Sequence, residues 1–515
     1  MEIFLYNHNY RYAVEQILLT IFPDERPVYP DAPGDGNRVE IELRRGTNID
    51  DAEDNLTPDN DADVAECRLY IDGELYEGRA EVQISRPAEE LEETRQLQRI
   101  VKFSFYHAAV ACNGVKPVWG ALTGIRPGKI ATDIMGADDL DSALRAGADR
   151  EILALDTLAD YYDVSPERAR LCVDTARASL IVKNSLEPGD IALYIGIPFC
   201  PTRCAYCSFV SNSVEKSFGL IAPFLEALFR EIEATAEVCE RLGLRVIALY
   251  IGGGTPTILS HSELDALCTR LGDNFDLSAV REFSVEGGRP ETISREKLEV
   301  LRKHDVGRFC VNPQTMRDEV LNAIGRRHSA QDVRDAVRLV KETSGFALNM
   351  DLIAGLPEDT VGGFRETLEE TLAFSPENIT VHTLSLKKGS KIMLEGTKLP
   401  GAAEVGEMLD IAQRLLSDAG YLPYYLYRQK FTSGGFENVG WSKKGFEGLY
   451  NICMMEEHCS ILSMGGGAST KLVADTGRIE RMFNPKYPLE FIRDIDKIRG
   501  EKEKIETFYN ALRTK

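Results

Sequence analysis

The fold of this chain is decided by the stretch Tyr194-Ile-Gly-Ile-Pro-Phe-Cys200-Pro-Thr-Arg-Cys204-Ala-Tyr-Cys207. It overlaps an apolar run, Ile191 to Ile197, that is typical of a buried strand. Its three cysteines have the spacing C-x3-C-x2-C, so one short loop carries three thiols. Three thiolates can ligate three irons of a [4Fe–4S] cluster. Because Phe209 stands two residues after the last cysteine, no fourth thiol is near and one iron would keep an open coordination position.

A zinc site and unpaired core cysteines are the alternative interpretations of this loop. Structural zinc usually takes four ligands from paired short motifs. The sequence contains neither a second C-x2-C motif nor a paired-histidine motif. The spacing therefore favours the cluster.

A second motif, Gly252-Gly-Gly-Thr-Pro-Thr257, follows the apolar run Val246 to Ile251, about 45 residues after the cysteines. Glycine lets the backbone approach a ligand closely, although a glycine run alone is equally typical of a flexible turn. Together with the aromatic Tyr206 before the last cysteine, the two motifs resemble those of radical S-adenosylmethionine (SAM) enzymes. The resemblance implies that SAM binds the open iron, and that an electron from the cluster cleaves its S–C5′ bond to release a 5′-deoxyadenosyl radical.

From Ile191 onward, apolar strands alternate with amphipathic helices, which is typical of βα units and a parallel sheet. Six repeats cannot close an eight-stranded barrel. The predicted fold class is therefore α/β, with a partial (β/α)6 TIM-like barrel whose ligands gather at the carboxyl ends of the strands. The predicted strands are Ile191–Ile197, Val246–Ile251, Glu282–Glu286, Val306–Val311, Ala347–Ile353 and Asn378–Leu384.

Three regions are expected along the chain. Residues 1–185 form an N-terminal α+β domain, in which two strands pair across the turn dipeptide Asp72-Gly73. Residues 186–420 form the radical SAM core, and residues 421–515 form a C-terminal accessory region that covers the open side of the sheet.

Composition limits the classes of function. The formal net charge of −22 disfavours a nucleic-acid partner, which needs a basic surface. No apolar run approaches the roughly 18 residues of a membrane span, and the N-terminus lacks the features of a signal peptide. The 11 cysteines, most of them scattered, are typical of a reducing compartment, so we expect a cytoplasmic protein.

A narrower resemblance covers residues 190 to about 390. The motifs Y-x-x-I-P-F-C, G-G-G-T-P-T, G-R-x-H and D-L-I-x-G-L-P resemble the oxygen-independent coproporphyrinogen III oxidase family. The usual His before I-P-F-C is Gly196 here, and the usual fourth Cys is Phe209. These departures, with the long first domain and its segment Leu122-Thr-Gly-Ile-Arg-Pro127, resemble the branch called HemZ, the coproporphyrinogen dehydrogenases. The missing fourth cysteine is also shared with haem chaperones of the same superfamily.

The resemblance implies roles for residues at successive strand ends. It implies that Tyr194 packs near the cluster and SAM, and that Glu286 and Arg326 bind the amino-acid end of SAM. Gln314 and Asp351 would bond its ribose hydroxyls, and Ser385 would contact the adenosine. The implied metal ligands are Cys200, Cys204 and Cys207, and the remaining implied cofactor contacts are Tyr206, Gly253, Gly254 and Thr255.

The function implied by the family is the oxidative decarboxylation of two propionates of coproporphyrinogen III to vinyl groups, giving protoporphyrinogen IX. It needs an electron donor and an electron acceptor besides the porphyrinogen. We expect cations near the strand ends to bind the substrate carboxylates, with His382 as a proton donor. The candidate cations are Arg203, Arg327, Lys387, Lys388 and Lys391, although a solvated surface charge is an equal interpretation for each.

The alternative is a haem-binding chaperone that keeps the cluster without decarboxylase activity. His382, His458 or Cys453 would then ligate the haem iron, although single residues of these types are usually structural. A radical SAM enzyme acting on another substrate is a third possibility.

Overall fold

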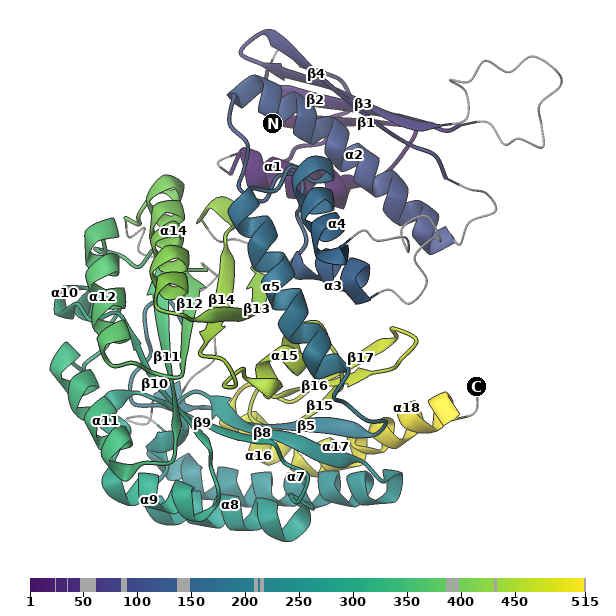
Figure 1. Ribbon diagram of the computed structural model, residues 1–515. Coiled ribbons are helices and arrows are strands. Elements are labelled where there is room, and N and C mark those ends of the chain that lie inside the picture. The colour runs from purple at the N-terminus through teal and green to yellow at the C-terminus, as the bar shows by residue number, and fades with distance from the viewer. Residues whose placement is uncertain are drawn as a thin grey trace. The chain divides into compact units, whose positions relative to one another are not determined.

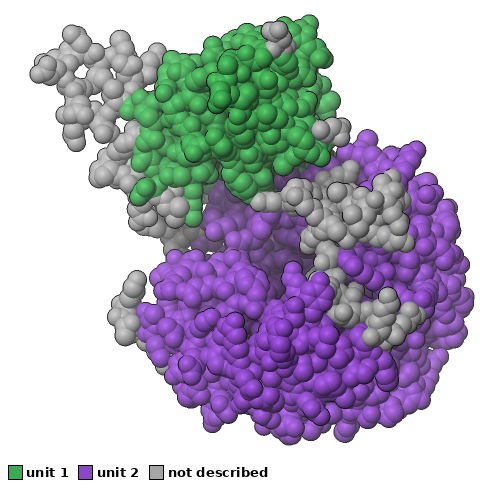
Figure 2. Space-filling view, turned by 180° about the vertical axis from the view of Figure 1, so that it is seen from behind, with its two compact units in different colours: residues 1–124, 147–170 green, residues 125–146, 171–515 purple. Residues whose placement is uncertain are grey.

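The computed structural model describes residues 1–23, 25–34, 36–46, 62–84, 90–136, 149–207, 212–213, 217–385, 392, 398–429 and 433–513. The chain forms two compact units, residues 1–124 with 147–170 and residues 125–146 with 171–515 (Figure 2). The predicted regions 1–185, 186–420 and 421–515 divide the chain differently, and their boundaries stay predictions.

The first unit contains a four-stranded sheet in the order β1-β2-β3-β4. Strands β1 and β2 are parallel, and the other pairs are antiparallel. Helix α2 packs against β3 and β4, and α1 packs against α2. The elements are β1 (Glu2–Tyr6), α1 (Arg11–Ile21), β2 (Arg38–Arg44), β3 (Asp63–Ile71), β4 (Glu74–Val82), α2 (Glu90–Asn113), α4 (Arg150–Asp156), the π-helix η2 (Thr157–Tyr161) and the start of α5 (Pro166–Lys183).

The hairpin between β3 and β4 turns at Asp72-Gly73, as predicted. Both residues have positive φ, 51° and 85°. Two positive φ values give the turn the right-handed twist that matches the paired strands, and Asp-Gly tolerates them.

The second unit is organised around an eleven-stranded sheet. Its six central strands are parallel neighbours, which confirms the predicted fold class. Along the sheet they follow chain order, and each is succeeded by a helix on the outer side of the curved sheet (Figure 1). The strands are β5 (Asp190–Ile197), β8 (Arg245–Gly253), β9 (Glu282–Gly288), β10 (Arg308–Gln314), β11 (Ala347–Ala354) and β12 (Asn378–Thr383), and the helices are α7 (Ile221–Leu242), α8 (His261–Asn274), α9 (Arg295–Lys303), α11 (Ala330–Thr343), α12 (Val361–Ala373) and α14 (Ala402–Asp418).

Local sequence explains where these elements begin. Ser260 and Ser329 each accept a hydrogen bond from a backbone N–H in the first turn and complete a capping box, at the starts of α8 and α11. Every residue of β10 is buried, as expected for a strand covered on both faces. The predicted strand from Val306 starts too early, because the Val306 N–H still donates to the Leu301 carbonyl at the end of α9.

Residues after 421 extend the sheet at both edges instead of only covering its open side. Strand β14 pairs antiparallel with β12, whereas β15 pairs in parallel with β5. Helix α15 packs against β8, β13 and β15, and the last helices pack against α7. These elements are β13 (Leu422–Arg428), β14 (Glu437–Ser442), α15 (Leu449–Glu456), β15 (Ser460–Gly465), β16 (Ser469–Val473), β17 (Ile479–Phe483), α16 (Pro488–Arg493), α17 (Ile495–Glu501) and α18 (Glu503–Arg513).

Short elements complete the described part of the chain. They are α3 (Gly128–Gly136), β6 (Phe199–Cys200), β7 (Asn212–Ser213), α10 (Asp318–Ala323) and the 3-10 turns η3 (Phe218–Leu220), η4 (Pro256–Ile258), η5 (Pro290–Thr292) and η6 (Ser433–Gly435). None of the helices in the described ranges is long and apolar enough to cross a membrane.

Candidate cofactor and substrate site

The cysteine loop leaves the carboxyl end of β5 and is fixed by neighbouring loops. The Ala205 N–H donates to the Ile324 carbonyl at 2.9 Å, and the Cys207 N–H donates to the Cys204 carbonyl at 3.1 Å. Cys200 is buried, whereas Cys204 and Cys207 are partly exposed. The loop is therefore held by backbone bonds while its thiols remain on the surface of a cavity.

The glycine run at the end of β8 packs against this loop, backbone to backbone. The N–H groups of Gly254 and Thr255 donate to the carbonyls of Ile197 and Phe199, each at 2.7 Å. A β-carbon on Gly254 would lie 2.4 Å from the Phe199 carbonyl oxygen. Gly253 has a φ of 109°, which glycine adopts without steric cost. The glycines are thus required for the close approach of β8 to the cysteine loop, and are more than a flexible turn.

The carboxyl ends of the parallel strands enclose a cavity of about 360 Å³. All the predicted metal- and cofactor-binding residues except Tyr194 line it. The residues that the structure brings together in this way are Cys200, Cys204, Tyr206, Cys207, Gly253, Gly254, Thr255, Glu286, Gln314, Arg326, Asp351 and Ser385.

Tyr194 lies behind this surface in a stack of aromatic rings. Its ring centroid is 6.2 Å from that of Tyr250 and 6.2 Å from that of Tyr450. The Tyr250 hydroxyl donates to the Glu286 carboxylate at 2.5 Å. Tyr194 therefore does not line the cavity itself but packs against Tyr250, which bonds the lining residue Glu286.

Two carboxyl groups face the cavity from β9 and β11. Burial raises the pKa of Glu286 to about 7; the Asp351 charge adds to this, and the Tyr250 hydroxyl and the Gly253 N–H oppose it. Asp351 accepts a hydrogen bond from Asn349 at 2.9 Å, and its other oxygen is 4.0 Å from His382 Nε2.

Gln314 is directed by an irregularity in its strand. The pairing of β10 with β11 shifts register between Val311 and Gln314, and Gln314 has a φ of 71°. A positive φ is uncommon for a non-glycine residue, and such strain gathers at functional sites. The break in the strand supplies both the Asn312 and the Gln314 side chains to the cavity wall.

Two buried arginines lie beside the cysteine loop. Arg326 donates to the Asn312 carbonyl and, at 3.3 Å, to the Tyr206 hydroxyl. Arg289, which the sequence reasoning missed, donates to Cys204 Sγ at 3.2 Å. Burial alone would raise the pKa of the Cys204 thiol. The two guanidinium groups and the hydrogen bonds from Tyr206 and Arg326 act in the opposite direction and are stronger together, so the pKa lies below its ordinary value.

Several other residues line the cavity, and all of them except His382 were not predicted as site residues. Arg289 follows β9 only three residues after Glu286, so the rule of strand ends would have found it. The next group comes from β13 and β14, which no βα pattern indicates. The lining residues outside the predicted cofactor set are Gly288, Arg289, Asn312, Ile353, His382, Thr383, Leu384, Tyr427, Gln429 and Asn438.

The residues predicted to bind the substrate carboxylates do not all lie in the cavity. Arg203 and Arg327 are exposed and do not line the cavity, whereas His382 does. Phe209, Lys387, Lys388 and Lys391 lie outside the described residues.

The polar groups of the cavity fit the predicted cluster and SAM. Three thiols meet one cavity, and three buried polar atoms of the residues that line it have no hydrogen-bond partner among the described residues: Arg289 Nη1, Asn312 Oδ1 and Arg326 Nε. A polar ligand with an ammonium and a carboxylate would satisfy donors and acceptors of this kind. Across the described ranges no three His, Cys, Asp or Glu side chains converge as a site for a single metal ion.

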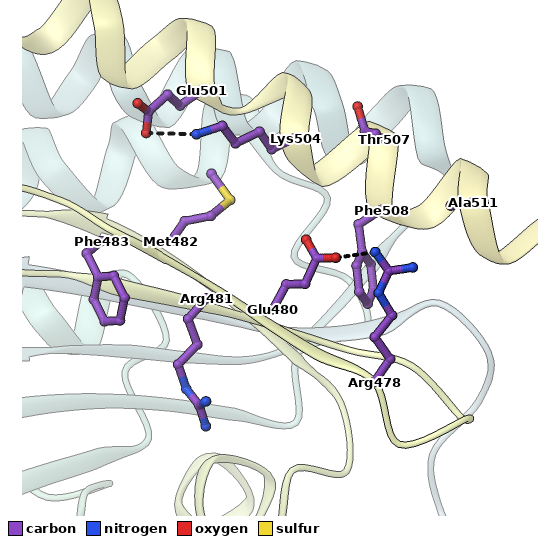
Figure 3. Close-up of a pocket in the computed structure, with 10 residues that line it drawn as sticks. All are labelled: Arg478, Glu480, Arg481, Met482, Phe483, Glu501, Lys504, Thr507, Phe508 and Ala511. Atoms are coloured by element: carbon purple, nitrogen blue, oxygen red, sulfur yellow. Dashed lines mark hydrogen bonds and ion pairs between the residues drawn. The ribbon is translucent and has the colours of Figure 1, made fainter. Parts of the chain in front are cut away.

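A second cavity of about 390 Å³ lies between β17 and α18 (Figure 3). Four of its charged residues pair with one another, Arg478 with Glu480 and Lys504 with Glu501, and Arg481 pairs with Glu457 outside the lining. It contains none of the predicted site residues.

Comparison with known proteins connects these features to relatives. Residues 194–371 match the model of the radical SAM superfamily. Over 421 residues the chain is 37% identical to the Bacillus subtilis oxygen-independent coproporphyrinogen-III oxidase-like protein HemZ, covering 81% of this chain and 82% of that protein. Over 306 residues it is 26% identical to the Haemophilus influenzae heme chaperone HemW, covering 59% and 76%. The solved structure of Escherichia coli coproporphyrinogen III oxidase, HemN, has 22% identity and a TM-score of 0.49, with 62% and 72% coverage.

Proposed function

Because this chain belongs to the radical SAM superfamily and to its family of oxygen-independent coproporphyrinogen-III oxidase-like proteins, we propose that it decarboxylates coproporphyrinogen III to protoporphyrinogen IX. Two propionates of the substrate become vinyl groups. Membership in the superfamily implies a [4Fe–4S] cluster and SAM as cofactors. The proposed site of action is the cytoplasm, where cysteines stay reduced.

The observation that carries the proposal is the shared cavity at the strand ends. Three thiols, two carboxylates and the buried Arg326 line it together. Cys200, Cys204 and Cys207 are the proposed cluster ligands. Since no fourth thiol is proposed, SAM takes the remaining position.

The cavity polar groups divide by charge in a way that suits SAM. Glu286 would accept hydrogen bonds from the SAM ammonium, and Arg326 would pair with its carboxylate. Asp351 and Gln314 would bond the ribose hydroxyls, and Ser385 would contact the adenosine. Arg326 is held by Asn312 and Tyr206, so its orientation costs little conformational entropy on binding.

When bound, the cluster and SAM supply reductive cleavage of SAM and a carbon-centred radical that abstracts hydrogen. The protein's share is to hold a propionate β-carbon near that radical and to keep water out. Loss of one hydrogen atom, then of CO2 and one electron, converts the propionate to a vinyl group. The proposal therefore requires an electron donor for the cluster and an acceptor for the released electron.

His382 is the proposed proton donor to the substrate. It lines the cavity at the end of β12, with its Nε2 4.0 Å from an Asp351 oxygen. An imidazole N–H at this position can donate a hydrogen bond to a substrate carboxylate.

The test is anaerobic incubation of reconstituted protein with SAM, a reductant and coproporphyrinogen III, followed by mass spectrometry of the porphyrin products. Mono- and divinyl products and released CO2 are expected. Asp351→Asn should retain the cluster and lose most turnover, because the amide cannot accept both ribose bonds. SAM cleavage without decarboxylated porphyrin would contradict the proposed reaction.

A haem chaperone is the second candidate, favoured by the similarity to HemW and by the position of His382 in the cavity. The other proposed haem ligands have internal partners: His458 bonds Ser179 Oγ at 2.7 Å, and Cys453 packs in a core cluster with Cys459. Stoichiometric haem uptake that His382→Ala abolishes, with no vinyl product, would support the chaperone.

A further inference from the structure

Arg289 is a buried cation aimed at one of the three cysteine thiols. It follows β9, where Gly288 with a φ of 64° turns the chain, and its N–H donates to the Gly287 carbonyl at 2.7 Å. The side chain is only 3% exposed. Its position is therefore set by the backbone turn that ends the strand.

One nitrogen of the guanidinium, Nη2, makes three contacts with the cysteine loop. It donates to Cys204 Sγ at 3.2 Å, to the Thr202 carbonyl at 3.0 Å and to Thr202 Oγ1 at 2.9 Å. The bonds to Thr202 fix the plane of the guanidinium. Arg289 thus reaches the sulfur from a fixed direction.

The positive charge of Arg289 is weakly compensated by carboxylates. Arg289 Nη1 lies 3.7 Å from the carboxylate of Glu291. The same carboxylate lies 3.2 Å from His328, so Arg289 shares it. In the described part of the chain, Nη1 has no hydrogen-bond partner. A buried charge is costly unless it is paired. Cys204 Sγ, 3.2 Å from Nη2, would supply negative charge here when it ligates a cluster as a thiolate.

Two of the three cysteines, Cys200 and Cys204, have different electrostatic surroundings. Cys200 receives a hydrogen bond from the neutral Thr255 hydroxyl at 3.4 Å. Cys204 instead faces the guanidinium groups of Arg289 and Arg326. Cys204 therefore lies beside more positive charge than Cys200 does.

We propose that Arg289 is a positioning residue that raises the reduction potential of the cluster through its hydrogen bond and charge at Cys204. Reduction adds an electron to the cluster, so a nearby cation and an N–H···S bond stabilise the reduced form more than the oxidised form. The role concerns the delivery of the electron that cleaves SAM. It requires the cluster but no porphyrinogen, so it goes beyond the proposed decarboxylation and can fail independently of it.

The sequence offers a matched control in Arg295, the first residue of α9. It pairs with Glu342 at 2.7 Å on the surface, with a side chain 49% exposed, and does not line the cavity. Substitution of Arg295 removes the same charge from the same loop-to-helix region. Solvent screens an exposed charge, so its effect on the cluster is small.

The experiment is an EPR-monitored redox titration of the reconstituted full-length protein, without substrate, for the wild type, R289Q, R289K and R295Q. Iron content is measured in each to verify a full cluster. In R289Q the ratio of reduced to oxidised cluster at a fixed potential should fall about tenfold, a shift of about 59 mV for a one-electron couple. R289K keeps the positive charge but lacks the planar guanidinium group, so its midpoint potential should shift less than that of R289Q. The midpoint potential of R295Q should match the wild type.

A fully loaded R289Q with the wild-type midpoint overturns the proposal, and so does an equal shift in R295Q. If R289Q fails to retain four irons, R289K decides: a midpoint below the wild type supports the proposal, and an unchanged midpoint overturns it. Absence of decarboxylase activity leaves these titrations unaffected.

Discussion

At the scale of single residues, the site depends on backbone contacts that side chains would block. Gly254 shows this most directly, because its N–H donates to Ile197 and a β-carbon there would collide with the Phe199 carbonyl. The glycine run therefore allows close backbone packing against the cysteine loop, whether or not it also contacts a ligand.

Gly254→Ala should displace the cysteine loop and destabilise the protein by about 1–3 kcal/mol, as overpacking does. Iron incorporation should also fall, measured as iron per chain after reconstitution. The control is Gly272→Ala in α8, where a β-carbon meets nothing within 4 Å. That substitution should be neutral or stabilising in thermal unfolding, since alanine favours a helix. Equal iron loading in both variants would contradict the interpretation.

Glu286 should make SAM binding depend on pH. Its pKa is raised to about 7, so the carboxylate that pairs with an ammonium forms only as the pH rises through 7. SAM affinity should increase between pH 6 and pH 8 in calorimetric titrations of the reconstituted protein. Glu286→Gln should bind more weakly and show a flat profile over this range.

The same shift has the opposite sign for the stability of the protein without cofactors. The native state holds the Glu286 proton up to about pH 7, whereas the unfolded state loses it near the ordinary glutamate pKa of 4.5. Since the native state binds more protons between these values, its stability falls as the pH rises through this window. Glu286→Gln should remove that part of the decline in urea unfolding.

At the scale of elements, a buried carboxylate joins the last strands to the central sheet. Glu231 on α7 accepts from the Gly465 N–H and from Asn484, each at 2.8 Å, and pairs with Lys502 at 2.6 Å. The turn after Gly465 then meets β5, because the Gly466 N–H donates to the Gly196 carbonyl at 3.1 Å. A β-carbon at Gly196 would lie 2.9 Å from the Gly466 oxygen, so this contact leaves little room for a side chain at position 196.

Lys502→Met should leave Glu231 buried without its cation and destabilise the protein by about 3–5 kcal/mol in denaturant unfolding. The double variant Glu231→Gln with Lys502→Met should recover part of this loss, because no charge is then buried. Lys497→Met, at an exposed i,i+4 pair with Glu501, is the control and should change stability little. A double variant less stable than the sum of the single ones would contradict this role.

At the scale of the whole molecule, the net charge of −22 opposes the proposed anionic substrate. The buried cations of the cavity attract carboxylates only at short range, whereas the general repulsion acts at long range. The balance between them depends on salt.

Raising the ionic strength from about 0.01 M to about 0.15 M shortens the screening length from about 30 Å to about 8 Å. The kcat/KM for coproporphyrinogen III should therefore rise over this range. SAM cleavage without porphyrinogen, measured as 5′-deoxyadenosine, should change little and serves as the control. A falling kcat/KM would indicate that a local basic surface dominates the encounter.

Much of the core was predictable because its signals are local in sequence. The cysteine spacing, the glycine run and the apolar strands followed by helices each lie within a few residues, and together they predict parallel strands whose ends converge. Carboxyl ends of parallel strands meet at one edge, so polar residues such as Glu286 and Asp351 were expected in one cavity before any coordinates.

By itself, then, the sequence determined the parallel core and the residues at its strand ends. Only the tertiary structure decided that β13 and β14 complete the cavity wall, that Gly254 is fixed by Phe199, and that Arg289 lies against Cys204. These features rest on contacts between residues far apart in the chain. Such contacts leave no periodic trace in the sequence, because they arise only when the folded sheet brings the loops together.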